Sequence, residues 1–170
     1  METPLTPLEF QRRARALYPE RECVVDEGRR LTYEAFFQHA DRWSAALQRL
    51  GVGKGDRVAY ISLNTTAHLE SFYAVPQIGA VLVPINFRLK PQEIEYIVQH
   101  SGARVVCAHA DFLKTVDGIR ANCPSVEHYV ALEGERGGWL DYQALCTTES
   151  GEFTRPDISE QDLLTINYTS

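Results

Sequence analysis

The hydroxyl residues at the end of the sequence, Thr169 and Ser170, are the residues best suited to chemistry. They follow the run 163–168, which has the length and apolar composition of a buried strand. In a sheet flanked by helices, ligands bind at the edge formed by the carboxyl ends of the strands. Hydroxyls and free backbone amides at that edge can hold phosphate oxygens. Because any strand can end in Thr-Ser, the residues alone leave two interpretations open, a phosphate site and an ordinary strand end.

A second segment resembles a phosphate-binding loop in composition, the glycine-rich run Gly51-Val52-Gly53-Lys54-Gly55-Asp56. The order of its neighbours contradicts that interpretation. A phosphate-binding loop follows a strand and opens a helix, so that the helix amides face the anion. Here a helical pattern precedes the run and a strand pattern follows it. The run is therefore predicted to be a turn from a helix into a strand.

The other residues that could carry chemistry form no recognisable site. The histidines lack zinc-ligand spacing with a third ligand nearby, and the sequence holds no Gly-x-Ser-x-Gly elbow. No pair of carboxylates is marked as a general acid and base. We therefore predict no catalytic residue and no metal ligand in this chain. The histidines are His39, His68, His100, His109 and His128.

The composition is that of an ordinary folded domain. The 170 residues are 44% hydrophobic and 24% charged, enough for one domain with a core. The formal net charge is −6, without a long Lys/Arg run, so nucleic acid is not expected as a partner. The longest apolar stretch, 78–85, is too short to cross a bilayer, and the amino terminus has no hydrophobic signal core. We therefore expect no transmembrane segment. The four cysteines are widely spaced, so we expect reduced thiols in a cytoplasmic protein.

The elements that must position the terminal hydroxyls alternate between strand and helix. This alternation implies right-handed βαβ units, so the predicted fold class is α/β, a mostly parallel sheet with flanking helices. Short apolar runs predict strands at 57–62, 81–83, 104–108 and 127–132, and helical spacing predicts helices at 65–79, 91–100 and 111–121.

A short helix at 8–17 and a hairpin at 23–32 precede these units. The next helix starts at Tyr33 after the N-cap Thr32, ends before Gly51, and has an aromatic face that belongs to the core. The helix at 65–79 is expected to be kinked or ended early by Pro76, because proline has no backbone donor. Its expected apolar side consists of Leu69, Phe72, Tyr73 and Ile78.

We divide the chain into three parts. Residues 1–132 form an amino-terminal α/β subdomain, and 133–156 form a connector with one or two helical turns. Residues 157–170 hold the strand that leads into the terminal hydroxyls. A folded domain seldom ends on an apolar strand and two bare hydroxyl residues, so the sequence is predicted to be a fragment of a longer protein.

Three stretches together resemble the adenylate-forming (AMP-binding) superfamily, which includes acyl- and aryl-CoA synthetases, firefly luciferase and the adenylation domains of peptide synthetases. The run LTYE at 31–34 resembles the first core motif, with Ala35 where the family usually has Leu. The run QIGAVLVPIN at 77–86 resembles the second motif. The run LTINYTS at 164–170 resembles the opening of the third, a phosphate-binding loop whose glycine-rich remainder and Lys are absent. The turn at 51–56 matches the family's helix-to-strand turn, so the resemblance covers residues 8 to 170.

The resemblance implies an acid–thiol ligase, specifically an acyl-CoA synthetase. Such an enzyme uses ATP and Mg²⁺ to convert a carboxylate into an acyl-adenylate, then transfers the acyl group to CoA. Thr169 and Ser170 match the first two hydroxyl positions of the loop and are implied to contact the nucleotide, whereas Tyr168 is taken as structural. The chain is implied to be the incomplete amino-terminal subdomain of the family's fold, with 157–170 the start of its ATP-binding strand and phosphate loop, and to be inactive by itself.

Several alternatives are open. The run PINFRL at 84–89 resembles the fatty acyl-CoA branch, but an aryl- or other carboxylate-CoA ligase is an alternative, since the acyl pocket lies outside these residues. A stand-alone scaffold or dimerisation module, or a nucleotide-binding regulatory domain, is an alternative of another class. The edge at 163–168 is expected to expose apolar surface and to favour self-association, for example as a homodimer.

Overall fold

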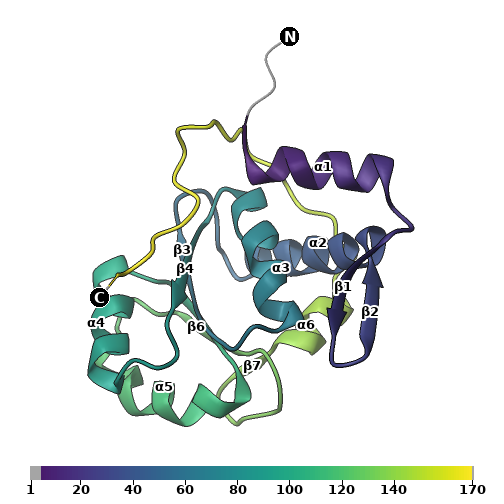
Figure 1. Cartoon of the computed structure of the whole chain (residues 1–170). Coiled ribbons are helices and arrows are strands. Elements are labelled where there is room, and N and C mark those ends of the chain that lie inside the picture. The colour runs from purple at the N-terminus through teal and green to yellow at the C-terminus, as the bar shows by residue number, and fades with distance from the viewer. Residues whose placement is uncertain (1–4, 170) are drawn as a thin grey trace.

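A five-stranded sheet lies at the centre of the computed structural model, which describes residues 5–169 (Figure 1). The strands are ordered β4-β3-β5-β6-β7, and every neighbouring pair is parallel. The predicted α/β class with a mostly parallel sheet is therefore confirmed. The strands are β3 (Arg57–Ile61), β4 (Val81–Ile85), β5 (Val105–Ala108), β6 (His128–Ala131) and β7 (Leu140–Asp141).

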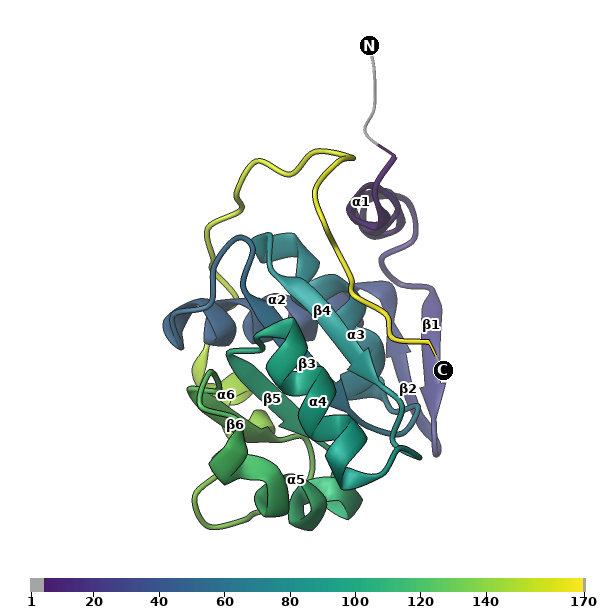
Figure 2. The ribbon, with the colours of Figure 1, turned by 90° about the vertical axis from the view of Figure 1, so that its left-hand side faces the viewer.

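Helices cover both faces of this sheet, and Figure 2 shows α4 in front of it and α2 behind it. Buried residues of α2, α3 and α6 pack on one face, and those of α4 and α5 pack on the other. Successive strand residues alternate between the two clusters, as in β3, where Tyr60 belongs to the first and Ile61 to the second. The helices are α2 (Tyr33–Arg49), α3 (Thr66–Ala74), α4 (Pro91–Ser101), α5 (Leu113–Ile119) and α6 (Tyr142–Thr148).

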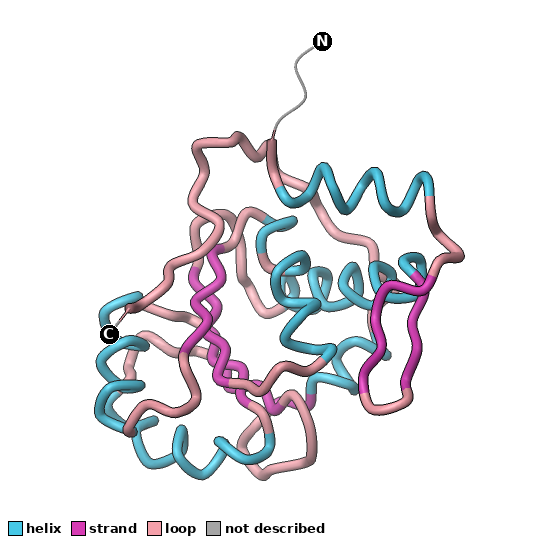
Figure 3. Tube along the Cα trace, viewed as in Figure 1, coloured by secondary structure: helices cyan, strands magenta, loops and turns pink. Residues whose placement is uncertain are grey.

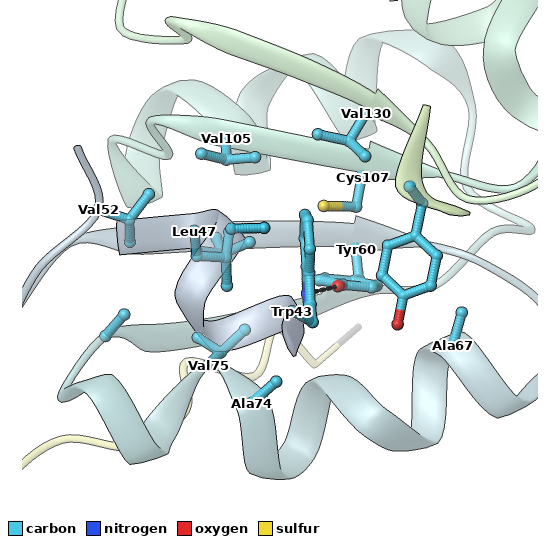
Figure 4. Packing of buried hydrophobic residues seen from close by; sticks show 14 of the residues in the cluster. Trp43, Leu47, Val52, Tyr60, Ala67, Ala74, Val75, Val105, Cys107 and Val130 are labelled. Atoms are coloured by element: carbon cyan, nitrogen blue, oxygen red, sulfur yellow. Dashed lines mark hydrogen bonds between the residues drawn. The ribbon is translucent and has the colours of Figure 1, made fainter. Parts of the chain in front are cut away.

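Trp43 of α2 lies in the middle of the first cluster (Figure 4) and is fully buried. Its indole Nε1 donates a hydrogen bond to Tyr60 Oη on β3 over 2.7 Å. Its ring contacts that of Tyr142 edge to face, with the centroids 4.8 Å apart. The helix itself begins as predicted, because the Thr32 side chain accepts a hydrogen bond from the Ala35 amide. The predicted core role of its aromatic face is confirmed.

The amino-terminal elements lie beside α2, away from the parallel sheet (Figure 3). They are α1 (Pro7–Leu17) and an antiparallel hairpin of β1 (Glu22–Asp26) and β2 (Arg29–Thr32). The hairpin turn places Glu27 and Gly28 at φ of 44° and 86°, a left-handed conformation that glycine adopts without strain. The predicted hairpin is thus confirmed.

The helix predicted at 65–79 ends early, as expected from Pro76. It stops at Ala74, and a 3-10 helix (Pro76–Ile78) follows. The predicted apolar side is wrong for Leu69 and Phe72, which are 42% and 39% exposed. The buried face instead includes Glu70, whose carboxylate accepts a hydrogen bond from Tyr142 Oη and pairs with His39 Nδ1 at 2.9 Å. The buried face of α3 thus meets polar partners on α2 and α6, which a hydrophobic pattern does not record.

The segment 133–156 contributes more than the helical turns expected of a connector. Leu140 and Asp141 form β7, which extends the sheet beyond β6. Helix α6 then packs Tyr142 and Cys146 into the first core cluster. A two-residue strand is too short to leave a recognisable alternation in the sequence.

The prediction of a buried strand at 163–168 is wrong. The segment is extended, but it forms one parallel bridge, between Leu82 and Thr165, and Leu163 is 58% exposed. Its place in the sheet explains the difference. It lies against the outer side of β4, at the sheet edge, so β4 covers one of its sides, and no strand pairs with its other side within residues 5–169.

Candidate functional site

The candidate site lies at the carboxyl edge of the sheet, where β3 and β4 send the chain to opposite faces. After β3 the chain enters α3 on one face, and after β4 it enters α4 on the other. In open α/β sheets, ligands bind outside the carboxyl ends of the strands, which is where this site lies.

The segment that carries the terminal hydroxyls reaches this edge by pairing with β4, as Figure 2 shows. The Leu82 amide donates to the Leu164 carbonyl, and the Ile166 amide donates to the Leu82 carbonyl, both over 2.9 Å. Because Thr165 lies opposite Leu82 in a parallel register, Thr169 emerges level with the end of β4. The carboxyl ends of both segments therefore meet at one edge.

A groove of about 590 Å³ opens at this edge, between α4 and the 163–169 segment. Asn86, the last residue of the second motif, and Thr169, from the third, both line it. Its walls are mixed, with apolar Leu89 and Ile97 beside polar Gln92 and Glu93. Two motifs separated by about eighty residues in the sequence thus contribute to one hollow.

Asn86 has a local role in shaping the groove. Its side-chain Oδ1 accepts a hydrogen bond from the Arg88 amide over 3.0 Å, and its carbonyl accepts from the Leu89 amide over 3.1 Å. These two bonds close the turn that leads from β4 into α4. Asparagine at this position therefore stabilises one rim of the groove through its own side chain.

Tyr168 connects the segment to α4. Its Oη lies 2.8 Å from His100 Nδ1, and the two rings meet edge to face with centroids 5.8 Å apart. Burial raises the pKa of the Tyr168 phenol, and nearby Tyr96 raises it further. The phenol therefore keeps its proton at neutral pH and remains able to hydrogen-bond with the imidazole. The histidine pattern in the sequence did not indicate this contact, because the two residues are 68 positions apart.

The structure places Thr169 at this groove, with its side chain exposed. Ser170, the other predicted nucleotide contact, lies outside the described residues. The glycine-rich turn at 51–56 lies at the opposite, amino edge of the sheet, because it leads into the start of β3. There Asp56 accepts from the Gly53 amide and pairs with Arg104 at 2.7 Å. The interpretation of this run as a helix-to-strand turn is confirmed.

The remaining histidines and cysteines do not gather into a metal-binding group in the described part of the chain. Among residues 5–169, no three His, Cys, Asp or Glu side chains are grouped so that they could hold a metal ion. The four cysteines are free, and three of them are buried. Burial raises the pKa of the Cys107 and Cys146 thiols, which keeps them protonated and unreactive. None of the helices in this part of the chain is long and apolar enough to span a bilayer.

Comparison with known proteins gives several related ligases. A long-chain-fatty-acid–CoA ligase of Thermus thermophilus is 36% identical over 162 residues, which are 92% of this chain and 30% of that protein. A probable acyl-activating enzyme of Arabidopsis thaliana is 32% identical over 98% of this chain and 34% of its own length. The chain thus spans about a third of the length of these curated relatives.

The solved structures agree with the sequence relatives. A crystal structure of an anthranilate CoA ligase in complex with anthranoyl-AMP matches 100% of this chain and 33% of its own, with a TM-score of 0.94 and 27% identity. A Mycobacterium tuberculosis fatty acyl CoA synthetase matches 95% of this chain and 32% of its own, with a TM-score of 0.86 and 28% identity. The family model for AMP-binding enzymes matches residues 10–170. The chain belongs to the family of AMP-binding enzymes, the adenylate-forming enzymes that its three motifs resemble.

Proposed function

We propose that this chain is the amino-terminal region of an ATP-dependent acyl-CoA synthetase. The complete enzyme would activate a carboxylate as an acyl-adenylate and transfer the acyl group to CoA. The observation that carries the proposal is the meeting of Asn86 and Thr169 along one groove at the carboxyl edge of the sheet. Ligands of open α/β sheets bind outside the carboxyl ends of the strands, and the relatives' names include several CoA ligases.

Thr169 and Ser170 are proposed to contact the phosphates of ATP. In the first step a carboxylate oxygen attacks the α-phosphorus and pyrophosphate leaves, so negative charge must be stabilised on the phosphate oxygens. A hydroxyl at Thr169 can donate to one of these oxygens without adding charge. In the second step the CoA thiol attacks the acyl carbon and AMP leaves.

Mg²⁺ is proposed as the counter-ion of the ATP phosphates. The described residues do not fit a protein-bound metal, since 5–169 hold no cluster of three ligating side chains. No step is therefore assigned to a metal held by this part of the chain.

For the carboxylate, we propose a fatty acid. Two relatives named for fatty acids support this, at 36% and 28% identity. An aryl carboxylate is the second candidate, because the anthranilate CoA ligase matches the whole chain with a TM-score of 0.94. A cytoplasmic site of action is proposed on the free, mostly buried cysteines.

Exchange of radiolabelled pyrophosphate into ATP tests the proposal in the full-length protein. Exchange is expected when a long-chain fatty acid is added, with weaker exchange for benzoate, anthranilate or 4-hydroxybutyrate. A preference for an aryl acid would support the proposed ligase activity but would replace the fatty acid as the proposed substrate. Absence of exchange with every acid would refute the proposed function.

A further inference from the structure

We infer that His100 is a positioning residue for the loop that starts at Thr169, which it holds through Tyr168. The inference rests on the proposed function, since the positioned hydroxyls are the proposed phosphate contacts. It concerns a side chain on α4 that lies outside the three family motifs.

The backbone of the 163–169 segment is paired with β4 only in its first half. Leu82 both donates to Leu164 and accepts from Ile166. In a parallel ladder, the next residue of β4 that can bond to the same neighbouring strand lies two positions after Leu82. That residue is Pro84. Proline has no N–H, so the next bond of the ladder, from residue 84 to the Ile166 carbonyl, cannot form.

Beyond Ile166 no backbone hydrogen bond joins the segment to β4 within the described chain. The side chain of Tyr168 provides a substitute. Its hydroxyl lies 2.8 Å from His100 Nδ1, and its ring meets that of His100 at an interplanar angle of 83°. His100 is in turn stacked on Tyr96, one helical turn earlier on α4, with centroids 5.3 Å apart. The last anchored residue is therefore the direct neighbour of Thr169.

Anchoring Tyr168 reduces the conformations that Thr169 and the following residues can adopt before ATP binds. A loop that is already ordered loses less conformational entropy when ATP binds. Losing the prior order is therefore expected to weaken the apparent affinity for ATP. Because the loop contacts ATP before and during the reaction, we expect the effect mainly on the KM for ATP.

The experiment measures steady-state kinetics of the full-length protein with Tyr168→Phe and His100→Phe. Both variants keep an aromatic ring and lose the hydrogen bond, and each is expected to raise the KM for ATP about fivefold, the net worth of one hydrogen bond. The kcat and the KM for the carboxylate are expected to change less than about twofold. The double variant is expected to match the single variants, because the two side chains share one interaction.

Two further variants separate positioning from general stability. His100→Asn places an amide near the position of Nδ1 and is expected to restore the KM for ATP. Gln99→Ala is the matched control, because it removes a hydrogen bond from the adjacent α4 residue to the Asn122 carbonyl, on a different element. It is expected to leave the KM for ATP unchanged.

An unchanged KM for ATP in both phenylalanine variants of an active enzyme would overturn the inference, and so would a loss confined to kcat. Amide hydrogen exchange of residues 167–169 gives a readout that does not depend on activity. Faster exchange in Tyr168→Phe and His100→Phe, but not in Gln99→Ala, is expected even if pyrophosphate exchange fails. Failure of the proposed function is thus distinguishable from failure of the positioning role, which unchanged amide exchange would refute.

Discussion

Replacing Tyr60 by Phe should destabilise the fold by removing the acceptor of a buried indole N–H. Tyr60 and Trp43 are both fully buried, and the Tyr60 hydroxyl accepts from the indole Nε1 over 2.7 Å. The substitution keeps the ring, so it opens little space in the core. It leaves a buried indole N–H without its acceptor.

An unsatisfied buried polar group costs about 1–3 kcal/mol. For a domain of this size, each kcal/mol corresponds to roughly 2–4 °C in Tm. We therefore expect Tyr60→Phe to lower the free energy of unfolding by about 1–3 kcal/mol without a change in the slope of the urea transition. Urea denaturation followed by circular dichroism measures both quantities.

Tyr96→Phe is the matched control, since it removes a hydroxyl from a side chain that is 59% exposed. It is expected to change the unfolding free energy by less than about 0.5 kcal/mol. Equal, small effects of the two substitutions would refute the argument, because they would mean that the buried bond contributes no more than an exposed hydroxyl.

Four further predictions follow from the site and its surroundings. In the full-length protein, Thr169→Ala should lower kcat/KM for ATP by roughly tenfold or more, the value of a hydrogen bond to a charged group, and Thr169→Ser should restore most of it; an unaffected Ala variant would exclude the phosphate contact. The 170-residue chain alone should show no measurable ATP binding by calorimetry, and tight binding would mean that its site is complete. If the exposed Leu163 drives self-association at the sheet edge, Leu163→Asp should shift size-exclusion elution of this chain toward monomer; identical elution would contradict that role. Asp26 accepts hydrogen bonds from the Thr66 hydroxyl and amide, which lower its pKa, so its stabilising contribution is present above the unfolded value of about 4 and is lost as pH falls through the folded value. The difference in unfolding free energy between the wild type and Asp26→Asn should therefore shrink as pH falls from about 5 through the lowered folded pKa, and a constant difference would disprove the linkage.

Local patterns were sufficient to predict most of the parallel sheet. The strand at Arg57–Ile61 is buried on both faces, so it reads as a continuous apolar run. Thr32, Gly51 and Pro76 mark element ends through their own chemistry, as a side-chain acceptor, a left-handed residue and a missing donor. These signals act within a few residues, so they can be recognised in the sequence without knowledge of the tertiary structure.

Buried polar groups and sheet edges were not readable in that way. Glu70 is buried because His39 and Tyr142, 31 and 72 positions away, meet its carboxylate. The 163–168 run is apolar in composition, yet whether it is covered depends on which strands lie beside it. Long-range partners of this kind are decided by packing.

The same distinction applies to the candidate site, part of which the sequence predicted and part of which only the structure revealed. The sequence by itself determined the class of fold and, through the family resemblance, the proposed nucleotide contacts Thr169 and Ser170. Only the tertiary structure brought Thr169 level with Asn86 and joined Tyr168 to His100. The physical reason is that a motif records the conformation and chemistry of consecutive residues, whereas a groove is formed by side chains whose distance is set by the register of strands far apart in the chain.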